Sequence, residues 1–234
     1  MTTIEAVREG DIVYVSMMLP DEQAAADFYA SVFGWTFERT EGEHSEVEIA
    51  GANIQHAINQ AGGPPNLFIC FAVDDVAATS AKVGPAGGNL EGTPYEEDGG
   101  LTVGVTDSTG RSTTLYQFLK APTPRATRSS AKHGDVIGIL VESNNPQGFT
   151  EFYQNIFAVD STWDAGELQG SEPLLRVIQA ERNRARPVYG VRSLTELETA
   201  VTAAGGTIEE DASWSAGGRR YIDPQGFFFY AEEL

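Results

Sequence analysis

Imidazole and thiol groups, which could bind a metal ion or act in catalysis, are few in this chain. The sequence has three histidines and one cysteine among 234 residues. His44 lies in a hydrophilic stretch and His133 in a segment without apolar periodicity, so only His56 lies on a predicted strand. A set of imidazoles and carboxylates on one face cannot be assembled from these positions. Cys70 would need a neighbouring base to act as a nucleophile, and His56 is its only conceivable partner.

Three arginines alternate in the sequence ERNRARP, at positions 182, 184 and 186. In an extended backbone all three side chains would point to the same side. A guanidinium such as that of Arg186 could hold an acidic or enolic ligand through two parallel hydrogen bonds. The alternative is a solvated loop before Pro187. No G-x-S-x-G, Walker or G-x-G-x-x-G motif is present. The sequence therefore predicts neither the nucleophile elbow of an α/β-hydrolase nor a phosphate-binding loop.

The charge of the chain restricts its partners. Lys and Arg number 15 against 34 Asp and Glu, which gives a formal net charge of −19. This field repels phosphate backbones and anionic lipid surfaces, so we expect no nucleic acid and no membrane as partners. It could attract a cationic small molecule, or it could serve solubility alone. The sequence has no run of about 18 apolar residues and no apolar leader core, so we predict a cytoplasmic protein.

The elements that must position these residues are clearest in DEQAAADFYASVFGW, residues 21–35. Asp21 is suited to cap a helix and Gly34 to end it, and a strand is predicted from Trp35 onward. Between them the apolar residues have the spacing of one buried helical face: Ala25, Phe28, Tyr29, Val32 and Phe33. The sequence NPQGFTEFYQNIFAVD, residues 145–160, repeats the pattern with Pro146 at the first helical position.

The whole chain reads as an internal duplication. The order strand, helix and three strands occurs twice within residues 10–118, where one of the predicted strands is Asn89–Tyr95. The second half follows the same order, and its DPQG turn at Asp223–Gly226 echoes the DSTG turn at Asp107–Gly110. Between the halves, Ala121–Gly134 lacks apolar periodicity and contains prolines, so it is predicted to be a solvated linker.

These motifs resemble those of the vicinal oxygen chelate superfamily, in particular its two-domain glyoxalase/bleomycin resistance/dioxygenase-like members. The resemblance is carried by D-x-x-x-A-x-x-F-Y-x-x-x-F-G-W from Asp21, FAVDD at Phe71–Asp75, AGG at Ala86–Gly88 and DSTG at Asp107–Gly110. It implies an α+β fold of four βαβββ modules, paired into two glyoxalase-like domains. Each domain would be a strongly curved mixed sheet around a cavity, with the helices outside. We expect these domains at residues 8–120 and 135–234, with residues 121–134 as the linker, and a monomer or a weak homodimer.

In enzymes of this superfamily a divalent metal is typically held by a His or Glu on the first strand of a module and a Glu on the last. The corresponding positions here carry Ser16, Phe68 and Thr114 in the first half and Leu140, Arg186 and Tyr230 in the second. None of these is a good ligand for a divalent metal in that role, and arginine would repel the ion. We therefore expect no metal and no cofactor. A register error of one or two residues would bring in Glu46, Glu48 or Glu142.

The same register implies which side chains face the cavities. The first cavity would be lined by Tyr14, Ser16, Met18, Phe68, Cys70, Thr114 and Tyr116, with His56 as a further candidate. The second would be lined by Arg186, Tyr221, Phe228 and Tyr230. An apolar, aromatic surface with a few hydroxyls is usual for a small-molecule pocket, but the same residues could simply fill a core. The run FFFY at Phe227–Tyr230 favours a strand that is buried on both faces.

The function expected from this set is that of a metal-free small-molecule binding protein. It would sequester an aromatic or cationic metabolite or antibiotic, as the resemblance to bleomycin-binding members implies. The alternative is a glyoxalase-like enzyme, namely a cofactorless lyase, isomerase or hydroxylase in which a tyrosine, His56 or Arg186 acts. A metal-dependent lyase or dioxygenase ranks after both.

Overall fold

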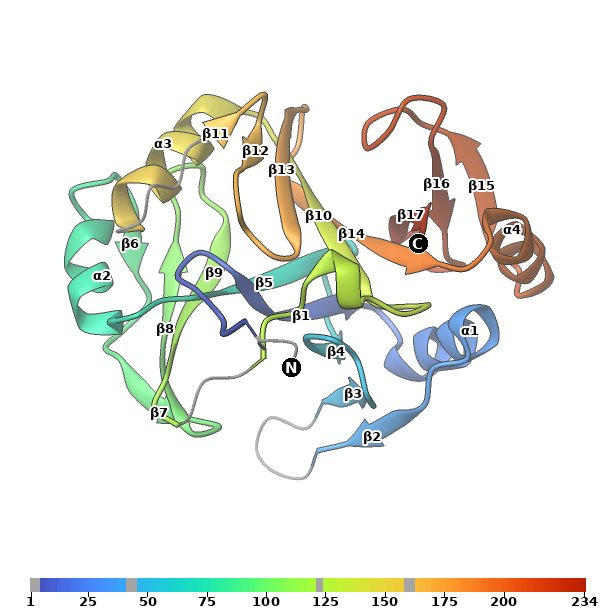
Figure 1. The fold of residues 1–234 in the computed structure, drawn as a ribbon, viewed down its shortest axis with the longest axis horizontal. Coiled ribbons are helices and arrows are strands. Elements are labelled where there is room, and N and C mark those ends of the chain that lie inside the picture. Colours follow the sequence, from blue (N-terminus) through green and yellow to red (C-terminus); the bar gives the residue numbers. More distant parts are fainter. Residues whose placement is uncertain (1–4, 41–45, 121–123, 158–162) are drawn as a thin grey trace. The chain divides into compact units, whose positions relative to one another are not determined.

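The fold is known from a computed structural model, which describes residues 5–40, 46–120, 124–157 and 163–234. The first half contains two modules in the predicted order (Figure 1). The first module consists of β1 (Ile12–Leu19), α1 (Glu22–Phe33), β2 (Phe37–Arg39), β3 (Val47–Ile49) and β4 (Gln55–Gln60). The second consists of β5 (Asn66–Ala72), α2 (Val76–Val83), β6 (Asn89–Leu90), β7 (Tyr95–Glu97), β8 (Gly100–Thr106) and β9 (Ser112–Phe118).

The second half repeats this order after a short 3-10 turn at Arg128–Ser130. The third module consists of β10 (Val136–Ser143), α3 (Pro146–Ile156), β11 (Trp163–Asp164), β12 (Glu167–Leu168) and β13 (Leu174–Gln179). The fourth consists of β14 (Arg184–Val191), α4 (Leu194–Ala203), β15 (Thr207–Glu210), β16 (Arg219–Ile222) and β17 (Phe228–Glu233).

The described strands of each half form one mixed sheet. The first sheet has the order β2-β3-β4-β1-β5-β9-β8-β6 with β7 paired to β8, and the second has the order β11-β12-β13-β10-β14-β17-β16-β15. A parallel pair, β5 with β9 and β14 with β17, lies in each sheet beside antiparallel neighbours. The predicted α+β fold of repeated βαβββ modules is thus confirmed.

Contacts divide the chain into two compact units, and each unit contains parts of both halves. Unit 1 comprises Met1–Tyr14, Ile69–Thr127 and Val141–Arg184, and unit 2 comprises Val15–Phe68, Arg128–Leu140 and Ala185–Leu234. Within unit 1, α2 contacts α3, and within unit 2, α1 contacts α4 (Figure 1). The domain bounds 8–120 and 135–234 stay a prediction.

The two longest helices begin and end where their sequences indicate. The Asp21 carboxylate accepts hydrogen bonds from the backbone N–H groups of Gln23 and Ala24, both at 3.0 Å, and Gly34 adopts a left-handed conformation with φ of 72°. The Asn145 side chain caps α3 in the same way, accepting from Gly148 N at 3.0 Å. In the described part of the chain no helix is both long enough and apolar enough to span a membrane.

Two stretches differ from their predicted structure. The predicted strand Asn89–Tyr95 is two strands, because Gly92 has a φ of 134° and Pro94 has no N–H to donate to a ladder. The solvated-loop alternative for the residues before Pro187 is wrong, since β14 begins at Arg184.

Arg125 lies in the predicted solvated linker, but its side chain is only 6% exposed. Its guanidinium donates two hydrogen bonds of 2.7 Å to the Asp11 carboxylate, through Nε and Nη2, and a further one to the carbonyl of Gly170. Asp11, 2% exposed, also accepts from the backbone N–H groups of Arg8 at 2.8 Å and Glu172 at 2.9 Å. This carboxylate therefore joins the three chain segments of unit 1.

We expect the variant Arg125→Met to lower the free energy of unfolding by about 3–5 kcal/mol, because it leaves the Asp11 carboxylate buried without its counter-ion. Denaturant unfolding measures this loss. The matched control is Arg39→Met, which removes the exposed ion pair to Glu22 and should cost at most about 1 kcal/mol. Equal losses in the two variants would contradict the importance of the buried pair.

Candidate functional site

In unit 1, one face of strands β8 and β9 consists mostly of small residues. Directly opposed residues in an antiparallel pair point to the same side, so Gly104 lies beside Thr114 and Thr102 beside Tyr116. On the other face Val103 is buried, and β8 contacts α2. The first face, called the β8–β9 open face, consists of Gly100, Thr102, Gly104, Thr106, Ser112, Thr114, Tyr116 and Phe118. Gly104, Thr114 and Tyr116 all remain partly accessible to solvent.

Tyr116 leans toward one end of this face. A side chain at position 100 would overlap the Tyr116 ring, so only glycine fits there. The Tyr116 hydroxyl lies 3.3 and 3.2 Å from the backbone carbonyls of Glu97 and Asp98, at the turn between β7 and β8. Burial raises the pKa of this phenol, and the charge of Asp98 raises it further, so it remains a neutral hydrogen-bond donor. The Gly104–Thr114 row beside it is partly accessible to solvent.

Glu91 occupies the opposite end of the open face. Its carboxylate accepts hydrogen bonds from Thr106 Oγ1 at 2.5 Å and Ser112 Oγ at 3.0 Å. A Cβ at position 104 would lie 3.0 Å from Glu91 Oε2 and 3.1 Å from Glu91 Cβ, so the Glu91 side chain lies against Gly104 in this row. The face thus has a small, partly hydroxylated floor between an aromatic ring and a fixed carboxylate.

Two more predicted site residues lie in unit 1. Cys70 is the register partner of Thr114 across the β5–β9 pair, and it is buried. Burial and the charge of Glu97 raise the pKa of its thiol, so Cys70 is not a thiolate nucleophile. Tyr14, on β1, is half-buried.

In unit 2, Ser16 and Met18 lie together on one side of β1. The buried Ser16 hydroxyl accepts a hydrogen bond from Asn59 Nδ2 at 2.8 Å and lies 3.7 Å from Met18 Sδ. Met18 and Phe68 are half-buried. Ser16 is therefore engaged with neighbouring protein atoms at the position where the superfamily's enzymes hold a metal ligand.

His56 lies on the other side of β4 from Asn59, because side chains alternate along a strand. Its ring stacks on Tyr189 with the planes 16° apart and meets Trp35 edge-on at 5.3 Å. The Tyr189 hydroxyl is 3.5 Å from His56 Nε2 and 3.8 Å from Met17 Sδ. Burial lowers the pKa of His56 to about 3. The structure thus brings His56 into an aromatic cluster and not beside Ser16.

Each unit contains a buried hydrogen bond between a helix tyrosine and the aspartate of a D-x-x-G turn. Tyr29 of α1 donates to Asp223 Oδ2 at 3.2 Å in unit 2, and Tyr153 of α3 donates to Asp107 Oδ2 at 3.4 Å in unit 1. Burial raises the pKa of both phenols well above their usual value, and the aspartate charges add to this.

In the second predicted set, in unit 2, Arg186, Phe228 and Tyr230 lie together, whereas Tyr221 does not join them. The Arg186 side chain is fully buried, with Cζ 4.0 Å from the centre of the Phe228 ring and Nη1 donating to Pro65 O at 3.3 Å. The Tyr230 hydroxyl donates to Asp211 Oδ2 at 3.2 Å. Tyr221 stacks on Phe229 and thus faces away from Phe228.

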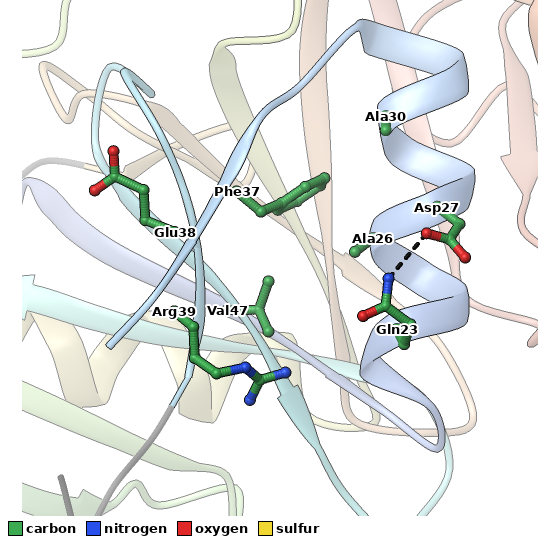
Figure 2. A pocket seen from close by; sticks show the side chains of 8 residues that line it. All are labelled: Gln23, Ala26, Asp27, Ala30, Phe37, Glu38, Arg39 and Val47. Atoms are coloured by element: carbon green, nitrogen blue, oxygen red, sulfur yellow. Dashed lines mark hydrogen bonds between the residues drawn. The ribbon is translucent and has the colours of Figure 1, made fainter. Parts of the chain in front are cut away.

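A shallow hollow of about 200 Å³ lies elsewhere in unit 2, between α1 and the hairpin of β2 and β3 (Figure 2). Figure 2 shows the eight residues that line it: Gln23, Ala26, Asp27, Ala30, Phe37, Glu38, Arg39 and Val47. On its rim Gln23 Nε2 donates to Asp27 Oδ1 at 2.9 Å. None of the predicted site residues lines this hollow.

Sequence reasoning missed Glu91 and Gly104. A signal for them exists in LTVGVTDSTG, residues 101–110, where small residues alternate with valines along a strand. Glu91 follows a short edge strand, and only the register of β6 and β8 brings it to Gly104. It also missed that Tyr29 and Asp223, each placed correctly in a helix and a turn, bond to each other.

The residues present do not fit the divalent metal of the superfamily. Serine, phenylalanine and threonine at positions 16, 68 and 114 offer at best neutral hydroxyls, and leucine, arginine and tyrosine at 140, 186 and 230 are no better. Across the described ranges, no group of three or more His, Cys, Asp or Glu side chains could hold a metal ion.

Comparison with known proteins agrees with this fold. Residues 11–113 match the family model "Glyoxalase/Bleomycin resistance protein/Dioxygenase superfamily". A "Putative glyoxylase CFP32" of Mycobacterium bovis is 31% identical over 121 residues, which are 47% of this chain and 46% of that protein. The chain thus matches about half the length of this relative. The "Anthracycline biosynthesis protein DnrV" of Streptomyces peucetius is 23% identical over 92% of this chain and 90% of that protein.

Solved structures share the fold over nearly the whole chain. The Mn(II)-bound glyoxalase from Novosphingobium aromaticivorans superposes with a TM-score of 0.70 at 17% identity, covering 97% of this chain and 82% of that one. The 2,3-dioxygenase LapB from Pseudomonas sp. KL28 gives a TM-score of 0.64 at 13% identity, covering 99% of this chain and 94% of that one. At such identities the likeness shows the fold alone.

We expect His56 to make the protein less stable as the pH falls. Its pKa in the folded state is about 3, against an ordinary value of 6.5, so the unfolded chain binds the extra proton between these values. Stability should therefore be lost as the pH falls from 6.5 toward 3, at up to about 1.4 kcal/mol per pH unit from this group.

The variant His56→Phe keeps a ring in the aromatic cluster. It should reduce the slope of the unfolding free energy against pH by the contribution of one proton, which denaturant unfolding between pH 3 and 6.5 measures. His133→Asn is the control, because that imidazole is less buried and should change the slope less. Equal slopes in the wild type and His56→Phe would contradict the assignment.

Proposed function

We propose that this chain is a member of the Glyoxalase/Bleomycin resistance protein/Dioxygenase superfamily and that it binds a small aromatic molecule on its β8–β9 open face without a divalent metal. The observation that carries the proposal is the Gly104–Thr114 row, which is partly accessible to solvent and lies between Tyr116 and Glu91. Glycine in the middle of a strand weakens it, and such a residue often marks a place where a ligand approaches the backbone.

The floor and its borders suit a flat ring system. Gly104 lets a ligand lie close to the sheet, while the hydroxyls of Thr114 and Thr106 offer hydrogen bonds at its edge. The Tyr116 ring, which meets Phe118 edge-on at 4.9 Å, supplies an aromatic wall. Cys70 and Tyr14 remain proposed contacts from β5 and β1, as predicted from the sequence.

The charges of this face favour a cationic ligand over an anionic one. The Glu91 carboxylate is held by two hydroxyls, and Glu97 and Asp98 follow one another at the Tyr116 end. A cation placed over Tyr116 would gain both from the ring and from these carboxylates. The net charge of −19 acts in the same direction over longer range.

Glyoxalase-like catalysis is the second candidate, and the name of the Mycobacterium bovis relative favours it. In that case Glu91 is the group on this face that could accept a proton from a bound substrate, since its carboxylate is fixed by Thr106 and Ser112. Turnover that disappears in Glu91→Gln while ligand binding persists would favour this second candidate over pure binding.

We expect quinoline and its cationic counterpart 1-methylquinolinium to bind the open face, the cation roughly fivefold more tightly. NMR of protein labelled at the threonine methyl groups locates the binding. Thr114 and Thr106 should shift on titration, while Thr207 in unit 2 should not. The variant Gly104→Val places methyl groups on the floor and should weaken both ligands about tenfold or more.

The matched control for this variant is Gly63→Val, which adds the same volume at a loop position with open space around it. It should leave both affinities unchanged. Binding that survives Gly104→Val, or methyl shifts that appear only in unit 2, would place the ligand elsewhere.

Protein purified without chelators should contain less than about 0.1 equivalent of Ni, Zn, Fe or Mn, because the positions of the superfamily's ligands carry no suitable donors. Metal analysis by mass spectrometry measures this directly. One equivalent of any of these metals, retained through gel filtration, would refute the metal-free proposal.

A further inference from the structure

One arginine and one phenylalanine exchange places between the second and the fourth module. The second module has Phe68 and Arg111, and the fourth has Arg186 and Phe227. Arg186 follows Phe68 by 118 residues, the same spacing as Tyr189 after Phe71, and Phe227 follows Arg111 by 116, the same spacing as Asp223 after Asp107. The duplicated positions therefore hold the same two residue types in exchanged order.

In unit 1 the arginine of this exchange lies beside a Tyr–Asp pair. Arg111 is buried and lies directly after the D-x-x-G turn, where its backbone N–H donates to Asp107 Oδ1 at 3.0 Å. Burial lowers the pKa of its guanidinium, while the charges of Tyr153 and Asp107 raise it. In turn the charge of Arg111 opposes the rise in the pKa of Tyr153. Arg111 thus supplies the positive charge beside the buried Tyr153–Asp107 hydrogen bond.

In unit 2 the corresponding positive charge is that of Arg186, which lies on β14, the first strand of the fourth module. The Phe227 backbone N–H donates to Asp223 Oδ1 at 2.9 Å, so Arg186, which packs on the Phe227 ring, lies next to the turn that holds Asp223. The positive charge of Arg186 also opposes the rise in the pKa of Tyr29, the phenol that donates to Asp223. Phe227 occupies the position that corresponds to Arg111, and its ring lies 5.3 Å from the Arg186 guanidinium. The two exchanged positions are therefore in contact in this module, so one arginine can serve the Tyr–Asp pair from either of them.

The surroundings of Arg186 are closed by neighbouring side chains. Phe228 and Tyr230 are buried, in contrast to the half-exposed Thr114 and Tyr116 of the second module. The Tyr230 hydroxyl bonds to Asp211, which lies 3.6 Å from Arg220 Nη1. The buried Trp214, from the same segment between β15 and β16, donates to Glu232 at 2.8 Å.

We infer that Arg186 is the internal counter-charge of the Tyr29–Asp223 pair, at a strand position where the superfamily holds a metal ligand, and that the fourth module has no ligand site. Each chain then binds one ligand, on the β8–β9 open face. The stoichiometry rests on the proposed function, whereas the role of Arg186 stands without it. A guanidinium at this position excludes a divalent cation by its own charge.

The exchange itself provides the test. Arg186→Phe removes the counter-charge and should lower the melting temperature by roughly 5–10 °C. Phe227→Arg alone buries a second guanidinium and should also lower it. The double variant R186F/F227R recreates the arrangement of the second module and should recover at least half of the loss seen in R186F. Arg219→Phe, which replaces an exposed arginine of the same unit, is the control and should have little effect.

If R186F does not fold, recovery of soluble, folded protein in R186F/F227R serves as the readout. A double variant no more stable than either single variant overturns the counter-charge role. Isothermal titration of the double variant with 1-methylquinolinium tests the stoichiometry, with one site and an unchanged affinity expected. Loss of binding in this folded variant would make Arg186 a ligand group, and two sites would overturn the closed module. Absence of binding in the wild type would count against the proposed function alone.

Discussion

The hydrogen bonds Tyr29–Asp223 and Tyr153–Asp107 are the constraint around which both units are arranged. Each aspartate also accepts from backbone N–H groups of its own D-x-x-G turn, so one carboxylate shapes the turn and fixes a helix from a distant module. A buried carboxylate without such partners would be costly. This explains why the F-Y pair of the helix and the D-x-x-G turn recur together in the chain. Their function is to join modules of different halves.

A positive charge nearby stabilises a buried Tyr–Asp pair. The two units supply this charge from different positions of the module. In the second module the charge comes from Arg111, directly after the turn, and the strand position is occupied by Phe68. In the fourth module it comes from the strand, and Phe228 and Tyr230 pack over it. The location of one arginine thus separates an accessible face from a filled one within a duplicated fold.

Part of the fold could be predicted from the sequence, because it depends on local interactions. Caps at Asp21 and Asn145 and the spacing of buried residues define α1 and α3 within a few residues, and the duplication follows from their similarity. The partner of Tyr29, in contrast, is 194 residues away, and no local pattern identifies it. The burial of Arg186 was not predictable for the same reason, since alternating charges suggest a solvated stretch unless long-range neighbours are known. His56 shows a third limit, because a strand pattern does not say which of its two faces meets the core.

The second and the fourth module differ in the sign of a charged side chain that they hold, Glu91 in the second and Arg186 in the fourth. Where a divalent metal is bound, the protein supplies carboxylates and the ion supplies the positive charge. In the fourth module the positive charge belongs to the chain itself, so nothing remains for an external cation to neutralise. In the second module the Glu91 carboxylate stays exposed at the end of the open face opposite to Tyr116, and its hydrogen bonds to Thr106 and Ser112 are with neutral groups. A ligand with a positive charge would therefore be attracted to this face. Under the proposed function, such a ligand supplies the positive charge that a metal ion supplies in metal-binding sites.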